Sequence, residues 1–191
     1  MRGGNVAVGN LPPLGLEYEG QFHSWGGGQV TLTDPVHSGF TASFAPPALG
    51  MSQVHNFGST VAGMVSAFGS PPMPVSVPGV PVAVRVDHVS DSGATMFFDT
   101  EMLQLDINFG GGVMVRESLT LQSLGKTEIT DIGGGMFFID SFFDVFTELS
   151  LDGGQTWIPS DGSVEMVLHP TPGAAGLLAL GGLAAARRRR N

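Results

Sequence analysis

The chain has 191 residues, a length that suits one domain with at most a short appendage. Its 29 glycines and 13 prolines, with charged residues at only 13%, exclude a helical bundle and a charge-rich disordered polymer, whereas a hydrophobic content of 42% is enough for a buried core. The net charge is −9, and residues 1–169 hold only four basic residues against 17 acidic ones, so they cannot form the cationic surface that nucleic-acid binding requires.

Residues 1–28 predict an irregular N-terminal segment. Val6, Ala7 and Val8 are followed at once by Gly9 and, three residues later, by Pro12. A secretory signal needs an apolar run of about 7–15 residues behind a basic start. We therefore expect an export signal to be missing from this start of the sequence.

Residues 29–169 predict the folded body. Two strands are expected at 30–33 and 40–44, separated by an Asp-Pro pair. Residues 45–81 contain seven prolines, which favours long surface loops around one or two strands, with one short strand or helix within 54–68.

From residue 82 onward the pattern of strands is stronger. Val82, Val84 and Val86 alternate with polar or small residues, and triple glycines at 110–112 and 133–135 predict turns. The clearest strand covers 136–151, and a last strand is expected at 163–168. Short strands joined by glycine turns, with no alternation of strands and helices, predict an all-β fold, an antiparallel β-sandwich of the jelly-roll or immunoglobulin-like class.

Residues 170–191 form a tail of different composition. Pro170, Thr171 and Pro172 precede 14 uncharged small or apolar residues at 173–186. As a helix these would span about 21 Å, short of the ~30 Å hydrocarbon core, so they predict a short hydrophobic C-terminal helix that is a marginal transmembrane helix and a temporary anchor. By the positive-inside rule, the basic block at the end of the tail predicts a stop-transfer signal that keeps residues 1–169 outside the cytoplasm. The block consists of Arg187, Arg188, Arg189 and Arg190.

This tail resembles the PEP-CTERM sorting signal of Gram-negative envelopes, which has a Pro-Glu-Pro motif, a hydrophobic helix and a basic end. Pro170 and Pro172 match the two prolines, and Thr171 stands where the family usually has glutamate. The resemblance implies that an exosortase, a membrane-embedded cysteine transpeptidase, cuts near the motif and removes the helix. It also implies that the membrane is a transient anchor and that the mature protein stays on the cell surface or outside the cell.

Residues 150–157 resemble the Asp-box of sialidase-like propellers. Ser150, Asp152, Gly154 and Trp157 occupy the positions of the pattern. The resemblance implies a structural hairpin in which the aspartate accepts backbone N–H groups and the tryptophan packs beneath the turn. Because the box occurs once and 191 residues cannot supply six blades, the pattern does not predict a sialidase.

No pattern predicts a catalytic residue, a cofactor site or a metal site. The chain has no cysteine, which excludes disulfides, thiolate zinc sites and a cysteine nucleophile. Asp140 and Asp144 are interpreted as solvated charges, and residues 87–93 as a polar turn. The histidines show no metal-ligand spacing and are interpreted as isolated surface or loop residues: His23, His37, His55, His88 and His169.

Together these observations predict an exported cell-envelope or extracellular-matrix protein of non-catalytic role. The alternative is a carbohydrate-binding module associated with exopolysaccharide, with Tyr18, Trp25 or Trp157 as a stacking platform. A small glycosidase would need paired carboxylates in a cleft, and no spacing in the sequence predicts them.

Overall fold

Antiparallel strands follow one another along the residues that the structure, a computed structural model, describes, namely 5–170. The first six are β1 (Asn5–Ala7), β2 (Leu16–Glu19), β3 (Phe22–Trp25), β4 (Val30–Ser38), β5 (Ser52–Ala67) and β6 (Met73–Ser92). The others are β7 (Thr95–Gly110), β8 (Val113–Glu117), β9 (Ser123–Gly133), β10 (Met136–Val145), β11 (Thr147–Ser150), β12 (Ile158–Pro159) and β13 (Val164–Pro170).

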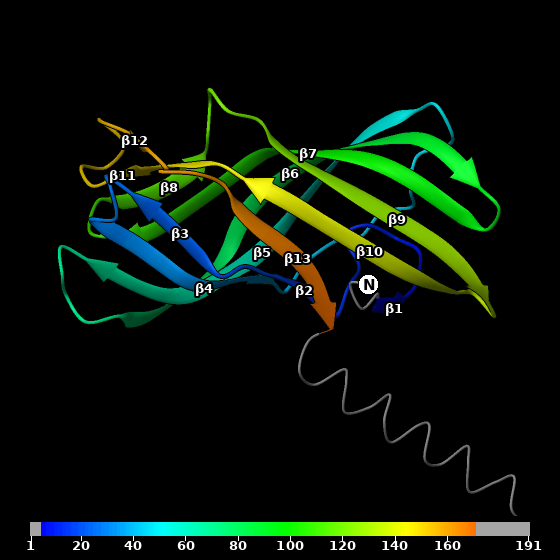
Figure 1. Ribbon diagram of the computed structural model, residues 1–191, viewed down its shortest axis with the longest axis horizontal. Coiled ribbons are helices and arrows are strands. Elements are labelled where there is room, and N and C mark those ends of the chain that lie inside the picture. The colour runs from blue at the N-terminus through cyan, green and yellow to red at the C-terminus, as the bar shows by residue number, and fades with distance from the viewer. Residues whose placement is uncertain (1–4, 171–191) are drawn as a thin grey trace, which may run out of the picture.

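Eight of these strands pair in a closed ring (Figure 1). Around the ring the order is β2, β4, β5, β6, β7, β9, β10 and β13. The pairing of β13 with β2 closes the ring. The molecule is therefore a closed antiparallel barrel, and the prediction of a β-sandwich is wrong. Strands with one buried face suit both architectures, and only the pairing between the two ends of the chain decides for the barrel.

Several stretches of the wall consist of two shorter strands in line. β8 and β9 both pair with β7, on either side of the loop 118–122, and β10 and β11 are separated only at Phe146. In the same way β2 and β3 both pair with β4, on either side of Gly20. Residues 16–25 therefore belong to the wall, and the prediction of an irregular segment over 1–28 is wrong for them.

Two loops add side chains to the interior. Leu11 and Phe44 form an isolated antiparallel bridge, and the ring of Phe40 lies edge-on to Tyr18 at 6.1 Å between centroids. Residues 40–44 are thus a covering loop and not the predicted strand, because their apolar side chains reach the core without a ladder of backbone hydrogen bonds.

The region predicted as proline-rich loops contains two of the longest strands. β5 has 16 residues and β6 has 20, and β6 includes Pro74, Pro78 and Pro81. In the described chain β6 pairs with β7 only from Val82 onward, so residues 73–81 have one neighbouring strand, β5. Proline is tolerated there because an edge position needs no N–H donor.

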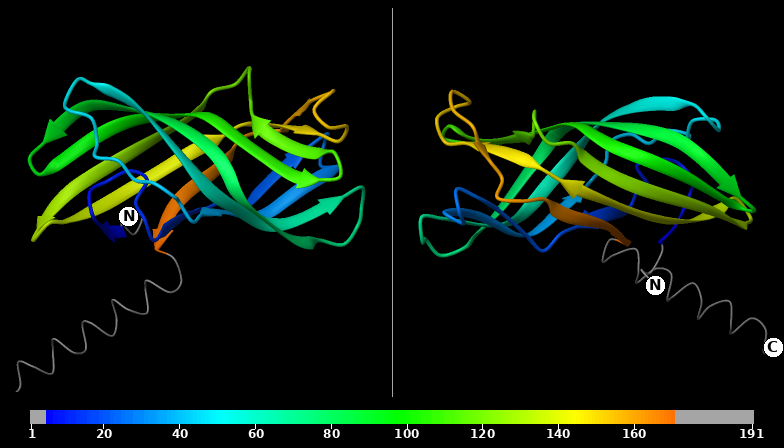
Figure 2. Two further views of the ribbon diagram at one scale, coloured as in Figure 1. Left: turned by 180° about the vertical axis from the view of Figure 1, so that it is seen from behind. Right: turned by 45° about the horizontal axis from the view of Figure 1, so that its top comes forward.

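The wall is therefore split over part of its height. Over residues 106–110 β7 pairs with β8 on one side and with no described strand on the β6 side, and the β5–β6 and β7–β8 hairpins diverge (Figure 2, left). In the described residues, 52–59 of β5 likewise pair only with β6, because the β4–β5 ladder ends at Thr60. The barrel is closed over one part of its height, and beyond Val82 and Leu105 the described strands β6 and β7 leave an open seam.

Residues 5–170 contain no helix, and none of them therefore forms a helix long and apolar enough to cross a membrane. The predicted C-terminal helix at 173–186 lies outside the described residues, so the fold that the structure shows is an all-β barrel alone.

Candidate functional site

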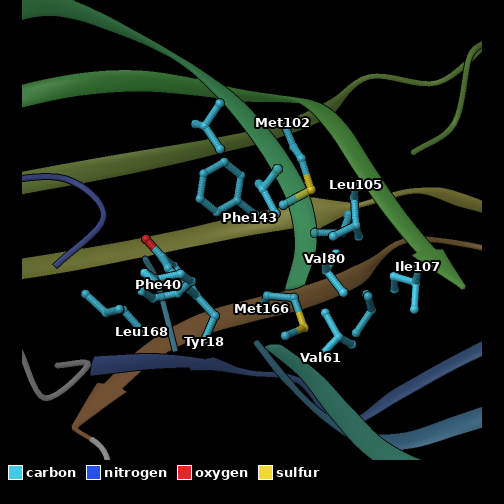
Figure 3. Close-up of a cluster of buried hydrophobic side chains, with 14 of the residues drawn as sticks. Tyr18, Phe40, Val61, Val80, Met102, Leu105, Ile107, Phe143, Met166 and Leu168 are labelled. Atoms are coloured by element: carbon cyan, nitrogen blue, oxygen red, sulfur yellow. The ribbon is translucent and has the colours of Figure 1, made fainter. Parts of the chain in front are cut away.

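The barrel encloses a cavity of about 80 Å³. Side chains from every part of the wall point into it, among them Met102, Leu105, Phe143 and Met166, which face one another in Figure 3. The alternation of each strand explains this arrangement, because every second residue of a wall strand faces the interior. Its apolar character makes the interior the natural candidate for a binding site.

Four of the five histidines are buried, which corrects their interpretation as surface or loop residues. His23, His37, His55 and His88 are each 8% exposed or less, and the first three line the cavity. Each lies on a wall strand at an inward position. The alternation that predicts inward valines places these histidines inward as well, and this signal could have identified them.

His23 belongs to a buried polar cluster that links β3 with β11. The hydroxyl of Thr147 accepts a hydrogen bond from Trp25 Nε1 at 3.1 Å and lies 2.7 Å from His23 Nε2. Burial lowers the pKa of His23 to about 4, and the Asp161 carboxylate opposes this shift only in part. The ring is therefore neutral at pH 7, and the Thr147 hydroxyl can donate its proton to Nε2.

His37 is neutral for the same reason. Burial lowers its pKa to about 4. Its Nε2 lies 2.6 Å from Ser59 Oγ, and Ser59 in turn donates to the carbonyl of Val80 at 3.3 Å. The imidazole therefore donates and the serine hydroxyl accepts, so the polar atoms of this pair are matched.

A third set of buried hydrogen bonds connects side chains of β2, β10 and β9. Tyr18 Oη lies 2.9 Å from Ser141 Oγ, which lies 2.7 Å from Thr127 Oγ1. Burial raises the pKa of Tyr18 to about 12, so its phenol is neutral and can donate. These hydroxyl groups satisfy one another inside the barrel.

Two polar atoms on the cavity wall remain unmatched. Among the described residues, His55 Nδ1 and Thr100 Oγ1 are buried and have no hydrogen-bond partner. The His55 ring stacks on Phe44 at 4.8 Å between centroids, and its Nε2 lies 3.2 Å from Gln53 Oε1. Burial lowers the pKa of His55, and the nearby carbonyl of Leu11 opposes this shift.

An unusual carboxyl group lies where β8 ends. Glu117 is 7% exposed, and neither of its oxygens has a hydrogen-bond partner in the described chain. Burial raises its pKa to about 8, and the negative charge of Glu101 adds to the shift, while the neighbouring Ser123 opposes it. Glu101 itself is neutralised by Arg85, whose Nη2 lies 2.7 Å from Oε2.

The hairpin at 150–157 is held by its own polar groups. Asp152 accepts hydrogen bonds from the backbone of Gln155 and Thr156, and Ser150 Oγ accepts one from Gly154 N at 2.8 Å. The Thr156 hydroxyl and the other donors lower the pKa of Asp152 to about 2. Trp157 donates to the carbonyl of Gly154 at 3.0 Å, so every one of these groups serves the turn.

Two of the three rings considered as sugar-stacking platforms are buried, and the third is covered on one face. Tyr18 and Trp25 are buried inside the barrel. The guanidinium carbon of Arg116 lies 3.9 Å from the centroid of Trp157 and covers one face of that ring. Stacking on a sugar needs an open aromatic face, which Tyr18 and Trp25 lack.

The acidic residues considered for chemistry are dispersed over the molecule. Asp140 and Asp144 lie opposite Glu128 and Leu124 of β9, and His88 contacts Asp91 at 2.6 Å. Residues 87–92 belong to β6, so the predicted polar turn is in fact the end of a strand. Within residues 5–170 no three His, Asp or Glu side chains are grouped as metal ligands.

The predicted sorting motif begins where the barrel ends. Pro170 is the last residue of β13 and lies opposite Leu16 of β2. Thr171, Pro172 and the stop-transfer arginines at 187–190 lie outside the described residues.

Comparison with protein-family models, with curated proteins and with solved structures finds no match to this chain. The structural class of the protein is therefore defined by its own fold and interior. It is an eight-stranded antiparallel barrel with an apolar, histidine-lined interior.

Proposed function

We propose that this protein is an exported cell-envelope or extracellular protein of non-catalytic role, which an exosortase-type enzyme processes at its C-terminal sorting signal. The support is the order of three elements at 170–191, namely the proline pair, the uncharged segment and the arginine block. In this proposal the membrane holds the protein only until the tail is removed.

The observation that carries the proposal is the position of Pro170. It is the last residue of the barrel wall and also the first residue of the motif. Because the ring closes within residues 16–170, a cut after Pro170 leaves every strand pair of the barrel in place. A tail that is to be discarded requires a body whose fold does not depend on it.

The test is to express the tagged protein in its native host and to determine its location and mass. An epitope tag in the exposed Gly133–Gly135 turn, where the added residues meet open space, marks the body without disturbing the tail. We expect the intact mass of the mature protein to lack roughly the last 20 residues, and a variant without 171–191 to fail to reach the cell surface. A fully processed protein that keeps Arg190 would contradict the proposal.

A matched pair of variants tests the motif itself. Pro172→Ala alters the proline pair, whereas Pro72→Ala alters a proline in the loop between β5 and β6. We expect only Pro172→Ala to slow removal of the tail, measured by pulse labelling and mass. Equal processing of both variants would mean that the proline pair is not recognised.

A further inference from the structure

We propose that the barrel interior binds one small, neutral, mostly apolar molecule that carries a single hydrogen-bonding group, such as a short-chain alcohol. This inference does not depend on the proposed export, because it uses only side chains of residues 5–170. Its evidence is the size, the charge and the unmatched polar atoms of the cavity.

The size of the cavity limits the ligand. An engineered apolar cavity of about 150 Å³ binds benzene or xenon. The cavity here measures about 80 Å³, which is roughly half as large. It therefore suits xenon or a molecule of about three or four heavy atoms, and it excludes sugars and fatty acids.

The charge of the lining requires a neutral ligand. None of the described residues that line the cavity is Asp, Glu, Lys or Arg. His23 and His37 are neutral because burial lowers the pKa of each to about 4. An ionic ligand would lose its hydration and find no opposite charge, which is strongly unfavourable.

The unmatched atoms define the polar part of the ligand. Within residues 5–170, Thr100 Oγ1 and His55 Nδ1 have no hydrogen-bond partner and both residues line the cavity, whereas His23, His37 and Thr127 are each paired. In the sheet Thr100 lies opposite Val86 and His55 opposite Val84, so a single strand, β6, separates them.

A hydroxyl group matches the chemistry of both atoms. His55 Nδ1 can accept or donate a hydrogen bond, because either ring nitrogen of a neutral histidine can carry the proton. The Thr100 hydroxyl can both donate and accept. A ligand hydroxyl could therefore donate to one of them or exchange a hydrogen bond with the other.

The split wall provides access to the interior. Ile107 and Phe109 lie in the part of β7 that has no pairing with β6, and both line the cavity. Phe109 is only partly buried, so the cavity reaches the seam between β6 and β7. A small molecule can enter there without breaking a strand pair.

Methionine methyl groups can report binding in the intact chain. Met102 and Met166 line the cavity, whereas Met51 and Met73 are exposed at 61% and 67%. We would label the methionine methyls with ¹³C and titrate with xenon and, separately, with 1-propanol. Saturable shifts confined to Met102 and Met166 are expected, and shifts absent or equal at all four would overturn the proposal.

Substitutions of Thr100 test the polar contact. Thr100→Val removes the hydroxyl at nearly constant volume, and Thr100→Ser keeps it. We expect Thr100→Val to weaken 1-propanol binding about three- to tenfold while leaving xenon binding unchanged, and Thr100→Ser to retain 1-propanol binding. Equal affinity for 1-propanol in Thr100→Val and the parent chain would show that the hydroxyl does not contact the ligand.

Discussion

Gly125 is a position at which the chain has no room for a side chain. A Cβ there would lie 2.2 Å from the Phe142 carbonyl oxygen and 2.8 Å from Phe143 Cδ1. Since a backbone oxygen cannot rotate away, β9 or β10 would have to move. We expect Gly125→Ala to lower the free energy of unfolding by about 3 kcal/mol, measured by urea denaturation.

Gly162 is the matched control for Gly125. No described atom lies within 4 Å of a Cβ built there, and the residue does not require a positive φ. We expect Gly162→Ala to change the free energy of unfolding by less than about 0.5 kcal/mol. Equal losses for the two variants would mean that close packing at Gly125 is not the cause.

Glu117 makes the protein less stable in alkali. Burial raises its pKa from 4.5 to about 8, so the folded state binds this proton more tightly than the unfolded state. The resulting stabilisation is complete below pH 4.5 and is lost as the pH rises through about 8. We expect Glu117→Gln to remove most of this loss, on the order of 3 kcal/mol, when urea unfolding is compared at pH 6 and pH 9.

The buried histidines have the opposite effect in acid. Burial lowers the pKa of His23 and His37 from 6.5 to about 4, so the unfolded state binds these protons more tightly. Their stabilisation is present above pH 6.5 and is lost as the pH falls through about 4. With the effect of Glu117, this predicts a stability maximum between about pH 6 and 7.

His37→Leu tests the contribution of a single histidine in acid. Ser59 keeps its hydrogen bond to the Val80 carbonyl in this variant, so no buried hydroxyl loses all its partners. Unfolding of this variant should take up about one proton fewer between pH 4 and 6.5. The slope of the free energy of unfolding against pH should therefore fall by about 1.4 kcal/mol per pH unit. An unchanged slope in urea melts across this range would show that His37 does not titrate on unfolding.

Among the elements, β6 shows why the proline-rich region was predicted as loops. Residues 73–81 pair with β5 on one side and with no described strand on the other. Pro74, Pro78 and Pro81 fall within this one-sided part and remove N–H donors from the exposed edge. Unpaired backbone groups on such an edge can pair with a strand of another chain, and prolines prevent this pairing.

Replacing an edge proline should therefore promote self-association. We expect Pro78→Thr to leave the monomer folded but to raise the fraction of dimers and larger species at high concentration, measured by light scattering. Pro72→Thr lies in the loop before β6 and should behave as the parent chain does. An equally monomeric Pro78→Thr would show that the prolines do not protect this edge.

At the scale of the whole molecule, closure of the ring makes the barrel independent of the tail. β13 and β2 pair from Val167 opposite Glu19 to Pro170 opposite Leu16, so the last contact of the wall is made at Pro170. We expect a chain ending at Pro170 to keep its melting temperature within about 2 °C, measured by circular dichroism. A larger fall would mean that residues 171–191 pack on the barrel.

Much of the secondary structure could be predicted from the sequence because its signals are local. The strand at 82–87 is confirmed, and the strand predicted at 136–151 is present as β10 and β11 with a break at Phe146, since alternation and glycine turns act between near neighbours. The contacts of the 150–157 hairpin also lie within eight consecutive residues. The candidate interior site was missed because His23, His37 and His55 come together only when distant strands close the ring.

By itself, the sequence determined an acidic, cysteine-free, all-β chain with a tail of distinct composition. The tertiary structure alone decided that the strands form a barrel, that four histidines are buried and that the wall is split between β6 and β7. The physical reason is the distance along the sequence over which each signal acts. A strand's alternation specifies which face is buried, but the partner that buries it lies far away in the sequence, and here the first and last strands of the ring supply each other's hydrogen bonds.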